Sequence, residues 1–205
     1  MVSTLIEKLS IRINHDLPGK FAQEKMFIKP SNNKVKTGGQ KKPAAVLILL
    51  YPNNEEWCFF LTKRTTIVEH HKGQISLPGG IIEQNESSKN AALRETHEEI
   101  GIKYDKINII GSLTSYYVPI SGFEIFPFLG WTEEKPKTKI NNLEVARLIS
   151  VSTNDLVLDK NYKIKNGMIL GHPVKIPYFD LCGEMVWGAT SVILSEFRFM
   201  LKEFL

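Results

Sequence analysis

The stretch GGIIEQNESSKNAALRETHEEIGI, residues 79–102, places three glutamates in the last turn and a half of a predicted helix: Glu95, Glu98 and Glu99. The helix is expected over residues 87–100, because Ser87 or Ser88 suits the N-cap and Gly101 suits the left-handed position after the last turn. Each like-charge pair costs roughly 0.2–0.5 kcal/mol, and the helix dipole adds to that cost at this end. Such a cluster therefore indicates a requirement other than stability.

The helical period separates these carboxylates from the expected core side. At 100° per residue they project within a sector of roughly 100°, and the opposite side carries apolar or small residues, Leu93, Thr96 and Ile100. Arg94 lies i, i+4 to Glu98 but cannot neutralise three carboxylates. Clustered carboxylate oxygens are preferred ligands of Mg²⁺ and Mn²⁺. By charge alone, the alternative is a solvated, glutamate-rich face.

The spacing around the glutamates favours the metal site. The order is Gly80, five residues, Glu86, seven residues, then Arg94-Glu95-x-x-Glu98-Glu99-x-Gly101-Ile102. This pattern resembles the Nudix box in full. The resemblance implies a Nudix hydrolase with a mixed β-sheet sandwiched between helices, which cleaves diphosphates with Mg²⁺ or Mn²⁺. Thr96 departs mildly from the family, which often has a larger aliphatic residue there.

The resemblance also implies roles for single residues. It assigns catalysis to four of them, Arg94, Glu95, Glu98 and Glu99, and metal binding to the three glutamates with Gly80. Glu95 is the first candidate for polarising the attacking water. The glycines Gly79 and Gly80 let the backbone approach the ligands without a Cβ in the way. Glu86 is expected to brace the box through an ion pair with Arg94, and Gly101 by ending the helix. His97 is expected to pack at the core boundary.

The segment LTKRTTIVEHHKGQISLPGG, residues 61–80, precedes the box and resembles the signature of coenzyme A diphosphatases. Seven residues match in register: Leu61, Thr62, Arg64, Gly73, Pro78, Gly79 and Gly80. Three positions depart, since Thr65 stands for Ser or Ala, Leu77 for Phe, and Glu69 for an arginine. Glu69 reverses a charge, so it bears on the identity of the substrate more than on the reaction.

At face value this resemblance implies cleavage of coenzyme A or acyl-CoA to 3′,5′-ADP and the 4′-phosphopantetheine half. We expect substrate contacts from Arg64, Gln74, Ser76 and Gly79, because the arginine fork binds two phosphate oxygens at once. At most one of His70 and His71 can face the ligand. Glu144 is a candidate general base, with a structural role in its strand as the alternative.

Two other functions remain open from the sequence. One is the same chemistry on ADP-ribose, NADH or another nucleoside diphosphate derivative. The other is a non-catalytic, nucleotide-sensing Nudix domain, which would be expected to lose box glutamates or to carry a DNA-binding unit. This chain keeps every box glutamate. Metabolite-sized nucleoside diphosphates are therefore the expected partners, and the resemblance also suggests a homodimer.

The composition is compatible with an ordinary globular enzyme. The chain has 205 residues, 42% hydrophobic and 23% charged, with a net charge of +4. That charge suits a small anionic ligand and is too low for a nucleic-acid-binding surface. Cys58 and Cys182 lack metal or redox spacing, which favours a reduced, cytoplasmic setting. No signal peptide is recognisable, and no apolar run approaches the ~20 residues of a membrane span.

The order of apolar runs predicts an α/β or α+β fold. Residues 44–51 are expected to be a strand buried on both faces, pairing with 56–64 in a hairpin. Further predictions are strands at 106–117, 122–131 and 144–151, a helix in 188–205, and a short helix opened by a capping box of Thr4 and Glu7. Residues 1–43 are assigned to an N-terminal helix, an extended stretch and a basic loop, as part of the same domain as the Nudix hydrolase region 44–205. The lysine-rich stretch 29–43 is expected to be a solvated loop or a phosphate-attracting flap.

Overall fold

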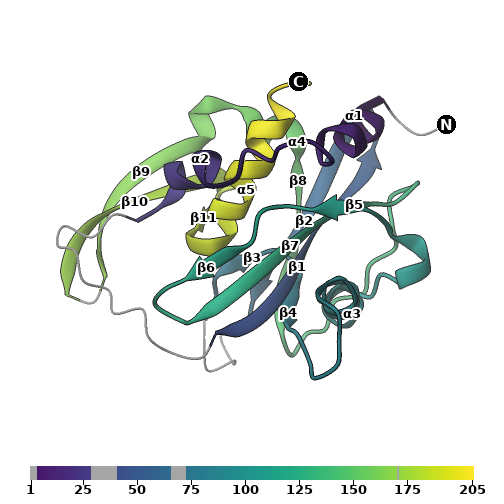
Figure 1. The fold of residues 1–205 in the computed structure, drawn as a ribbon, viewed down its shortest axis with the longest axis horizontal. Coiled ribbons are helices and arrows are strands. Elements are labelled where there is room, and N and C mark those ends of the chain that lie inside the picture. Colours follow the sequence, from purple (N-terminus) through teal and green to yellow (C-terminus); the bar gives the residue numbers. More distant parts are fainter. Residues whose placement is uncertain (1–3, 29–40, 66–72, 170) are drawn as a thin grey trace.

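A mixed, eight-stranded β-sheet forms the centre of the computed structural model, which describes residues 4–28, 41–65, 73–169 and 171–205 (Figure 1). Its path is β3-β2-β1-β7-β5, with β4 beside β1, β6 beside β7 and β8 beside β2. The strands are β1 (Lys42–Asn53), β2 (Glu56–Arg64), β3 (Ile75–Ser76), β4 (Gly79–Ile81), β5 (Asn108–Ser112), β6 (Tyr116–Val118), β7 (Phe123–Trp131) and β8 (Val145–Ser152). β1 and β7 are parallel, and the other pairs are antiparallel.

Side chains of β1 alternate between two separate cores, because successive residues of a strand point to opposite faces. Leu47, Leu49 and Tyr51 pack under the helix α3 (Ser88–Ile100). Ile48 and Leu50 belong to the larger cluster on the other face. The predicted burial of this strand on both faces is confirmed, and so is its hairpin with β2.

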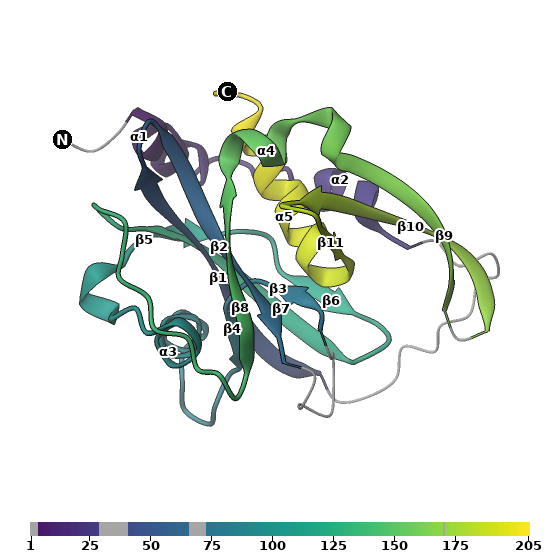
Figure 2. The same ribbon diagram turned by 180° about the vertical axis from the view of Figure 1, so that it is seen from behind.

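The second face of the sheet is covered by the N- and C-terminal helices, which Figure 2 shows from behind. The helices other than α3 are α1 (Thr4–Arg12), α2 (Gly19–Gln23), α4 (Thr153–Val157) and α5 (Gly188–Leu201), with 3₁₀ turns η1 (Glu24–Met26), η2 (Tyr104–Lys106) and η3 (Asp159–Asn161). Helices therefore lie on both faces of a mixed sheet, as predicted. Within the described ranges, no helix has the length and apolarity needed to cross a bilayer.

A three-stranded antiparallel sheet, which the sequence did not predict, lies beside α5. Its order is β11-β10-β9, from the strands β9 (Tyr162–Ile169), β10 (His172–Leu181) and β11 (Glu184–Trp187). β9 has no buried residue and β10 contains Pro173 and Pro177. β9 therefore lacks a buried face, and in β10 the prolines interrupt a pattern that otherwise alternates between buried and exposed residues.

Two predicted elements near the sheet edge were wrong in detail. Residues 106–117 do not form one strand, because β5 ends at Ser112 and β6 begins only at Tyr116. Between them Thr114 turns its N–H toward a buried carboxylate instead of a strand. The stretch after α1 is also not extended, since it contains α2 and η1. β1 begins at Lys42, inside the predicted basic loop, and the remaining part of that loop at 29–40 lies outside the described residues.

That buried carboxylate belongs to Glu196, in the middle of α5, and its side chain joins three parts of the chain. Glu196 is 0% exposed. It accepts hydrogen bonds from the Gly19 N–H (3.1 Å), Gln23 Nε2 (3.0 Å), and both the N–H (3.2 Å) and the Oγ1 (2.7 Å) of Thr114. All four groups are donors, which matches an acceptor-only carboxylate. The network ties α5 to α2 and to the β5–β6 connection.

Replacing this acceptor by an amide should weaken the fold. In Glu196→Gln an NH₂ group would face donors, so we expect the free energy of unfolding to fall by about 2–4 kcal/mol. Urea denaturation followed by circular dichroism measures this loss. The control is Glu203→Gln at the end of the same helical region, whose partner Arg12 is on the surface. Equal, small losses in both variants would contradict a structural role for the Glu196 network.

Candidate active site in the box

The local sequence sets both ends of α3 and therefore the directions of its glutamates. Ser87 is the N-cap, and its Oγ accepts the Asn90 N–H at 3.2 Å. Gly101 ends the helix with a φ of 76°, and its N–H donates to the His97 carbonyl at 2.8 Å. A Cβ on residue 101 would also meet the backbone of Lys139. The observed bounds agree with the predicted ones at both ends.

Burial around α3 differs from the predicted pattern at one glutamate. Thr96 and Ile100 are buried as expected, and Leu93 packs at the edge of the same core. Glu98 has half of its side chain exposed, whereas Glu99 is only 2% exposed. The prediction that all three carboxylates lie opposite the core was therefore wrong for Glu99. Its direction is only about 60° from that of Thr96 around the axis, close enough for neighbouring strands to cover it.

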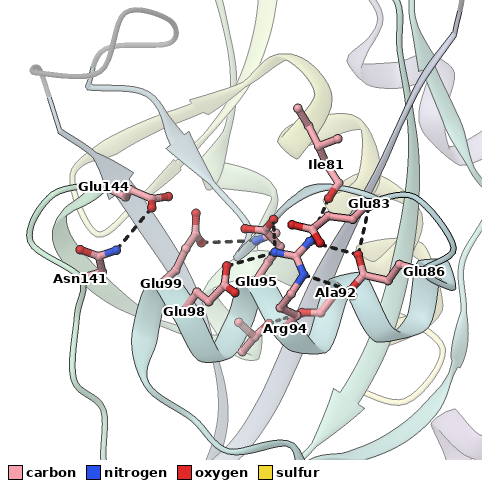
Figure 3. A network of polar contacts seen from close by, with 12 residues as sticks. Ile81, Glu83, Glu86, Ala92, Arg94, Glu95, Glu98, Glu99, Asn141 and Glu144 are labelled. Atoms are coloured by element: carbon pink, nitrogen blue, oxygen red, sulfur yellow. Dashed lines mark hydrogen bonds and ion pairs between the residues drawn. The ribbon is translucent and has the colours of Figure 1, made fainter.

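Arg94 holds the loop before the helix and two of the glutamates together (Figure 3). Its guanidinium donates to both oxygens of Glu86, at 2.9 and 3.1 Å, so the expected brace is present in the structure. It also donates to the Ile81 carbonyl (3.0 Å), to Glu95 (2.8 Å) and to Glu98 (3.0 Å). The hydrogen bond from Arg94 lowers the pKa of the Glu86 carboxyl, and Glu86 in turn raises the pKa of Arg94.

Gly79 and Gly80 allow β4 to lie close to β1 and to α3, respectively. A Cβ on Gly80 would lie 2.5 Å from the Glu95 carboxyl carbon, so any other residue would displace that side chain. Gly79 has a φ of 152°, and its missing Cβ would clash with the Ala45 carbonyl of β1. Burial raises the pKa of Glu95, although its hydrogen bond with Arg94 opposes the shift. Gly80 is thus the surface on which the Glu95 carboxylate rests, and Gly79 lies against β1.

Glu99 is the most sheltered carboxylate of the box. Its Oε2 accepts the Gly79 N–H at 3.3 Å, and Arg64 Nη1 lies 3.7 Å from its Oε1. Burial raises the pKa of Glu99 to about 8; Arg64 and the Gly79 N–H oppose that shift, whereas the charges of Glu95 and Glu144 add to it. A charged carboxylate at this position therefore requires more positive charge than Arg64 supplies.

Glu144 brings a fourth carboxylate toward the box from the residue before β8, as Figure 3 shows. Its Oε1 accepts a hydrogen bond from Asn141 Nδ2 at 3.3 Å, and its charge acts on both Glu95 and Glu99. Asn141 was not selected from the sequence. It also donates its backbone N–H to the Glu99 carbonyl (2.9 Å), and its Oδ1 accepts the Leu143 N–H (3.1 Å). The only sequence signal was an Asn-rich turn before the strand.

The predicted substrate residues lie on the same side of the sheet but differ in their contacts. Arg64 ends β2 beside Glu99, and its N–H donates to the Gln74 carbonyl at 3.0 Å. The Ser76 hydroxyl is 3.1 Å from that of the buried Thr62, so it already has one hydrogen-bonding partner. The positions of Glu69, His70 and His71 lie outside the described residues.

His97 lies apart from the carboxylates, as expected. Its ring packs edge-on against Tyr104, with centroids 5.3 Å apart. The side chain is partly buried.

The donor chemistry of the site suits a hard divalent cation, although the side chains do not yet converge on one point. In the part of the chain that the structure describes, no three acidic, histidine or cysteine side chains are arranged to hold a metal ion. Arg94 accounts for this arrangement, because it draws Glu98 and Glu95 toward itself. The buried carboxylates provide the oxygen ligands that Mg²⁺ and Mn²⁺ require. Because Gly80 has no Cβ, there is room for the Glu95 carboxylate beside it.

The raised pKa of Glu99 predicts how metal-free stability depends on pH. Between the ordinary value of 4.5 and about 8, the folded protein keeps a proton that the unfolded chain releases. The wild type should therefore lose stability as the pH rises through that window. Glu99→Gln avoids the loss, so with a chelator present it should exceed the wild type at pH 8.5 by about 1–3 kcal/mol, and by much less at pH 5.

Chemical denaturation at both pH values, in EDTA, measures this difference. Glu98→Gln is the matched control on the same helix, because its side chain is half exposed and the variant keeps Glu99, so its stability should fall with pH as that of the wild type does. A Glu99→Gln advantage that is the same at pH 5 and pH 8.5 would show that Glu99 does not titrate in this window.

Comparison with known proteins agrees with the site. Residues 41–169, more than half of the chain, match the family model for the NUDIX domain. The uncharacterized Nudix hydrolase NudL of Photorhabdus laumondii is 26% identical over 140 residues, covering 66% of this chain and 73% of the relative. NudL of Enterobacter sp. is 29% identical over 137 residues, covering 66% and 71%.

A solved structure shows the same fold. The crystal structure of a Nudix hydrolase from M. smegmatis, RenU, aligns with a TM-score of 0.59 at 17% identity, covering 87% of this chain and 95% of that one. Its likeness confirms the predicted mixed sheet between helices. The chain belongs to the Nudix hydrolase family, and it is a hydrolase that acts on diphosphate bonds.

Proposed function

We propose that the protein hydrolyses the diphosphate of coenzyme A or an acyl-CoA, releasing 3′,5′-ADP and (acyl-)4′-phosphopantetheine. The site is supported above all by the two sheltered carboxylates of Glu95 and Glu99, held against Gly79 and Gly80. The choice of substrate rests on the segment 61–80, which resembles the coenzyme A diphosphatase signature. A cytoplasmic location and a homodimer are proposed on the weaker grounds of cysteine usage and resemblance.

Nudix hydrolases generally use a divalent cation such as Mg²⁺ or Mn²⁺. In this chain we assign its ligands to the carboxylates of Glu95, Glu98 and Glu99 and to the backbone of Gly80. A bound ion would supply positive charge that offsets the negative charge of the diphosphate as it is cleaved. The half-exposed Glu98 would have to turn away from Arg94, to which it is bonded at 3.0 Å.

The remaining residues position the reactants. We assign the orientation of the attacking water to Glu95, and Glu144, held by Asn141, is the second candidate for accepting its proton. Arg94 holds the loop before α3 and the Glu95 carboxylate in fixed positions relative to each other through its ion pairs with Glu86 and Glu95. Substrate contacts are assigned to Arg64, Gln74 and Ser76, while Gly79 provides close approach. Because phosphoryl transfer depends mainly on positioning and electrostatics, few further side chains are required.

Removal of one carboxylate should abolish most turnover without unfolding the protein. We expect Glu99→Gln to lower kcat about 100-fold or more, since a ligand that counters transition-state charge contributes several kcal/mol. Release of 3′,5′-ADP measures turnover, and the Mn²⁺-induced rise in melting temperature measures binding; both should fall. Glu83→Gln, in the loop before the helix, is the control. A Glu99→Gln variant with wild-type kcat would remove Glu99 from the site.

A substrate panel should separate coenzyme A from the alternatives. With Mg²⁺ or Mn²⁺, we expect kcat/KM for coenzyme A or an acyl-CoA to exceed that for ADP-ribose and NADH by about tenfold or more, the effect of roughly 1.4 kcal/mol of selective contacts. Mass spectrometry identifies the products. A preference for ADP-ribose would overturn the assigned substrate and leave the reaction class in place.

A further inference from the structure

The backbone around Arg64 is fixed in a way that directs its side chain toward α3. Its neighbour Lys63 lies opposite Arg147 of β8, whereas Arg64 lies opposite Val145, so the register shifts at this point. Such bulges change the direction of a side chain. Hydrogen bonds clamp the chain on both sides: the Arg64 N–H donates to the Gln74 carbonyl, and the Thr65 N–H to the Glu144 carbonyl at 2.9 Å. The guanidinium therefore has a defined position beside the box.

The guanidinium nevertheless uses little of its bonding capacity there. Arg64 Nη1 is 3.7 Å from Glu99 Oε1, which is an ion-pair contact but too long for a hydrogen bond. Its Nε is buried and has no hydrogen-bond partner among the described residues. An arginine presents five N–H donors in a planar fork. This group is thus held near a carboxylate by charge, with donors still available for another acceptor.

Glu99, for its part, depends on Arg64. Arg94 pairs with Glu86, Glu95 and Glu98, but it has no ion pair with Glu99. Within the described ranges, Arg64 is the one cation at ion-pair distance from the Glu99 carboxylate. The other contact is a single N–H, from Gly79. Arg94 therefore pairs with Glu95 and Glu98, and Arg64 pairs with Glu99. Glu99 is the most buried of the three glutamates and has the longest ion-pair distance.

We propose that Arg64 is an exchangeable counter-ion. It stays at ion-pair distance from Glu99 while the site holds no ion, it is released when a divalent cation takes that carboxylate, and it then binds a phosphate oxygen of the substrate. The inference rests on the proposed role of Glu99 as a ligand. Two cations repel at one carboxylate, so the arginine and the ion compete. A planar fork with free donors matches a phosphate group, which then becomes the stronger acceptor.

This exchange gives Arg64 two effects of opposite sign. Without substrate it weakens metal binding, because the ion must displace a charge already paired with Glu99. With substrate it strengthens binding of the diphosphate, and only after the ion has freed it. Metal and substrate are then coupled through one side chain, and the coupling acts equally in both directions. A residue that only contacted substrate would not affect the metal affinity of the free protein.

The test is titration of the nucleotide-free protein with Mn²⁺, followed by calorimetry or by the electron paramagnetic resonance signal of free Mn²⁺. Arg64→Gln should bind Mn²⁺ about 3- to 30-fold more tightly than the wild type, the effect of one partly screened charge near 4 Å. The same variant should show a lower kcat/KM for its diphosphate substrate. Arg64→Met, a second neutral variant, should show the same gain, and Arg64→Lys should stay close to the wild type.

Two controls locate the effect. Lys63→Gln changes the adjacent residue of β2, whose ammonium pairs with Glu184 on the opposite face, and should leave Mn²⁺ affinity within about twofold. In a Glu99→Gln background, Arg64→Gln should no longer tighten Mn²⁺ binding. Equal or weaker binding by both neutral Arg64 variants would overturn the exchange. Mn²⁺ binding that is unaffected by Glu95→Gln and Glu99→Gln would instead refute the proposed site itself.

Discussion

The Glu99 side chain is 2% exposed, and a charged carboxylate so deeply buried is unfavourable unless positive charge or hydrogen-bond donors compensate it. The arrangement of the residues around Glu99 depends on this compensation. Within the described ranges the compensation is incomplete, because it consists of one backbone N–H and one guanidinium beyond hydrogen-bond distance. Burial consequently raises the pKa of Glu99 to about 8. A divalent cation would remove the remaining imbalance, which connects the unfavourable charge of the metal-free site with the chemistry of the family.

Glu196 shows what a buried glutamate looks like when its role is structural. It is on the other side of the sheet, in α5, and its carboxylate is surrounded by backbone, amide and hydroxyl donors from α2 and the β5–β6 connection. Those bonds satisfy the acceptor, so no cation is required. Among the residues that the structure describes, Glu99 has only one such donor. Both carboxylates are buried, but Glu99 accepts fewer hydrogen bonds than Glu196. This difference supports a functional role for Glu99.

The close approach of α3 to β4 makes the site possible. It requires glycine at 80, because a Cβ there would overlap the Glu95 carboxylate, and glycine at 79 lets β4 pair closely with β1, because a Cβ there would overlap the Ala45 carbonyl. Arg94 then fastens the connecting loop to the helix through Glu86 and the Ile81 carbonyl. The glycines of β4 and the contacts of Arg94 together allow α3 to end in three glutamates. The electrostatic cost at its C-terminal end is offset by two arginines, Arg94 and Arg64, and by the proposed ion.

Parts of this arrangement follow from short stretches of sequence. Ser87 and Gly101 determine the ends of α3, and the apolar run of β1 with its following turn predicts the central hairpin, since capping and alternation are local properties. β9 and β10 were missed for an equally local reason. The residues of β9 are mostly exposed and those of β10 are interrupted by proline, and the two strands form by pairing with each other and, for β10, with β11.

The sequence by itself determined the family, the helix, and the order of its carboxylates around the axis. Only the tertiary structure decided that Glu99 is buried while Glu98 is half exposed, because covering depends on which strand lies against each face. It also decided that Glu144 and Asn141 join the box, and that Arg64 rather than Arg94 faces Glu99. Helical periodicity fixes the direction of a side chain, whereas its neighbours come from segments distant in the chain.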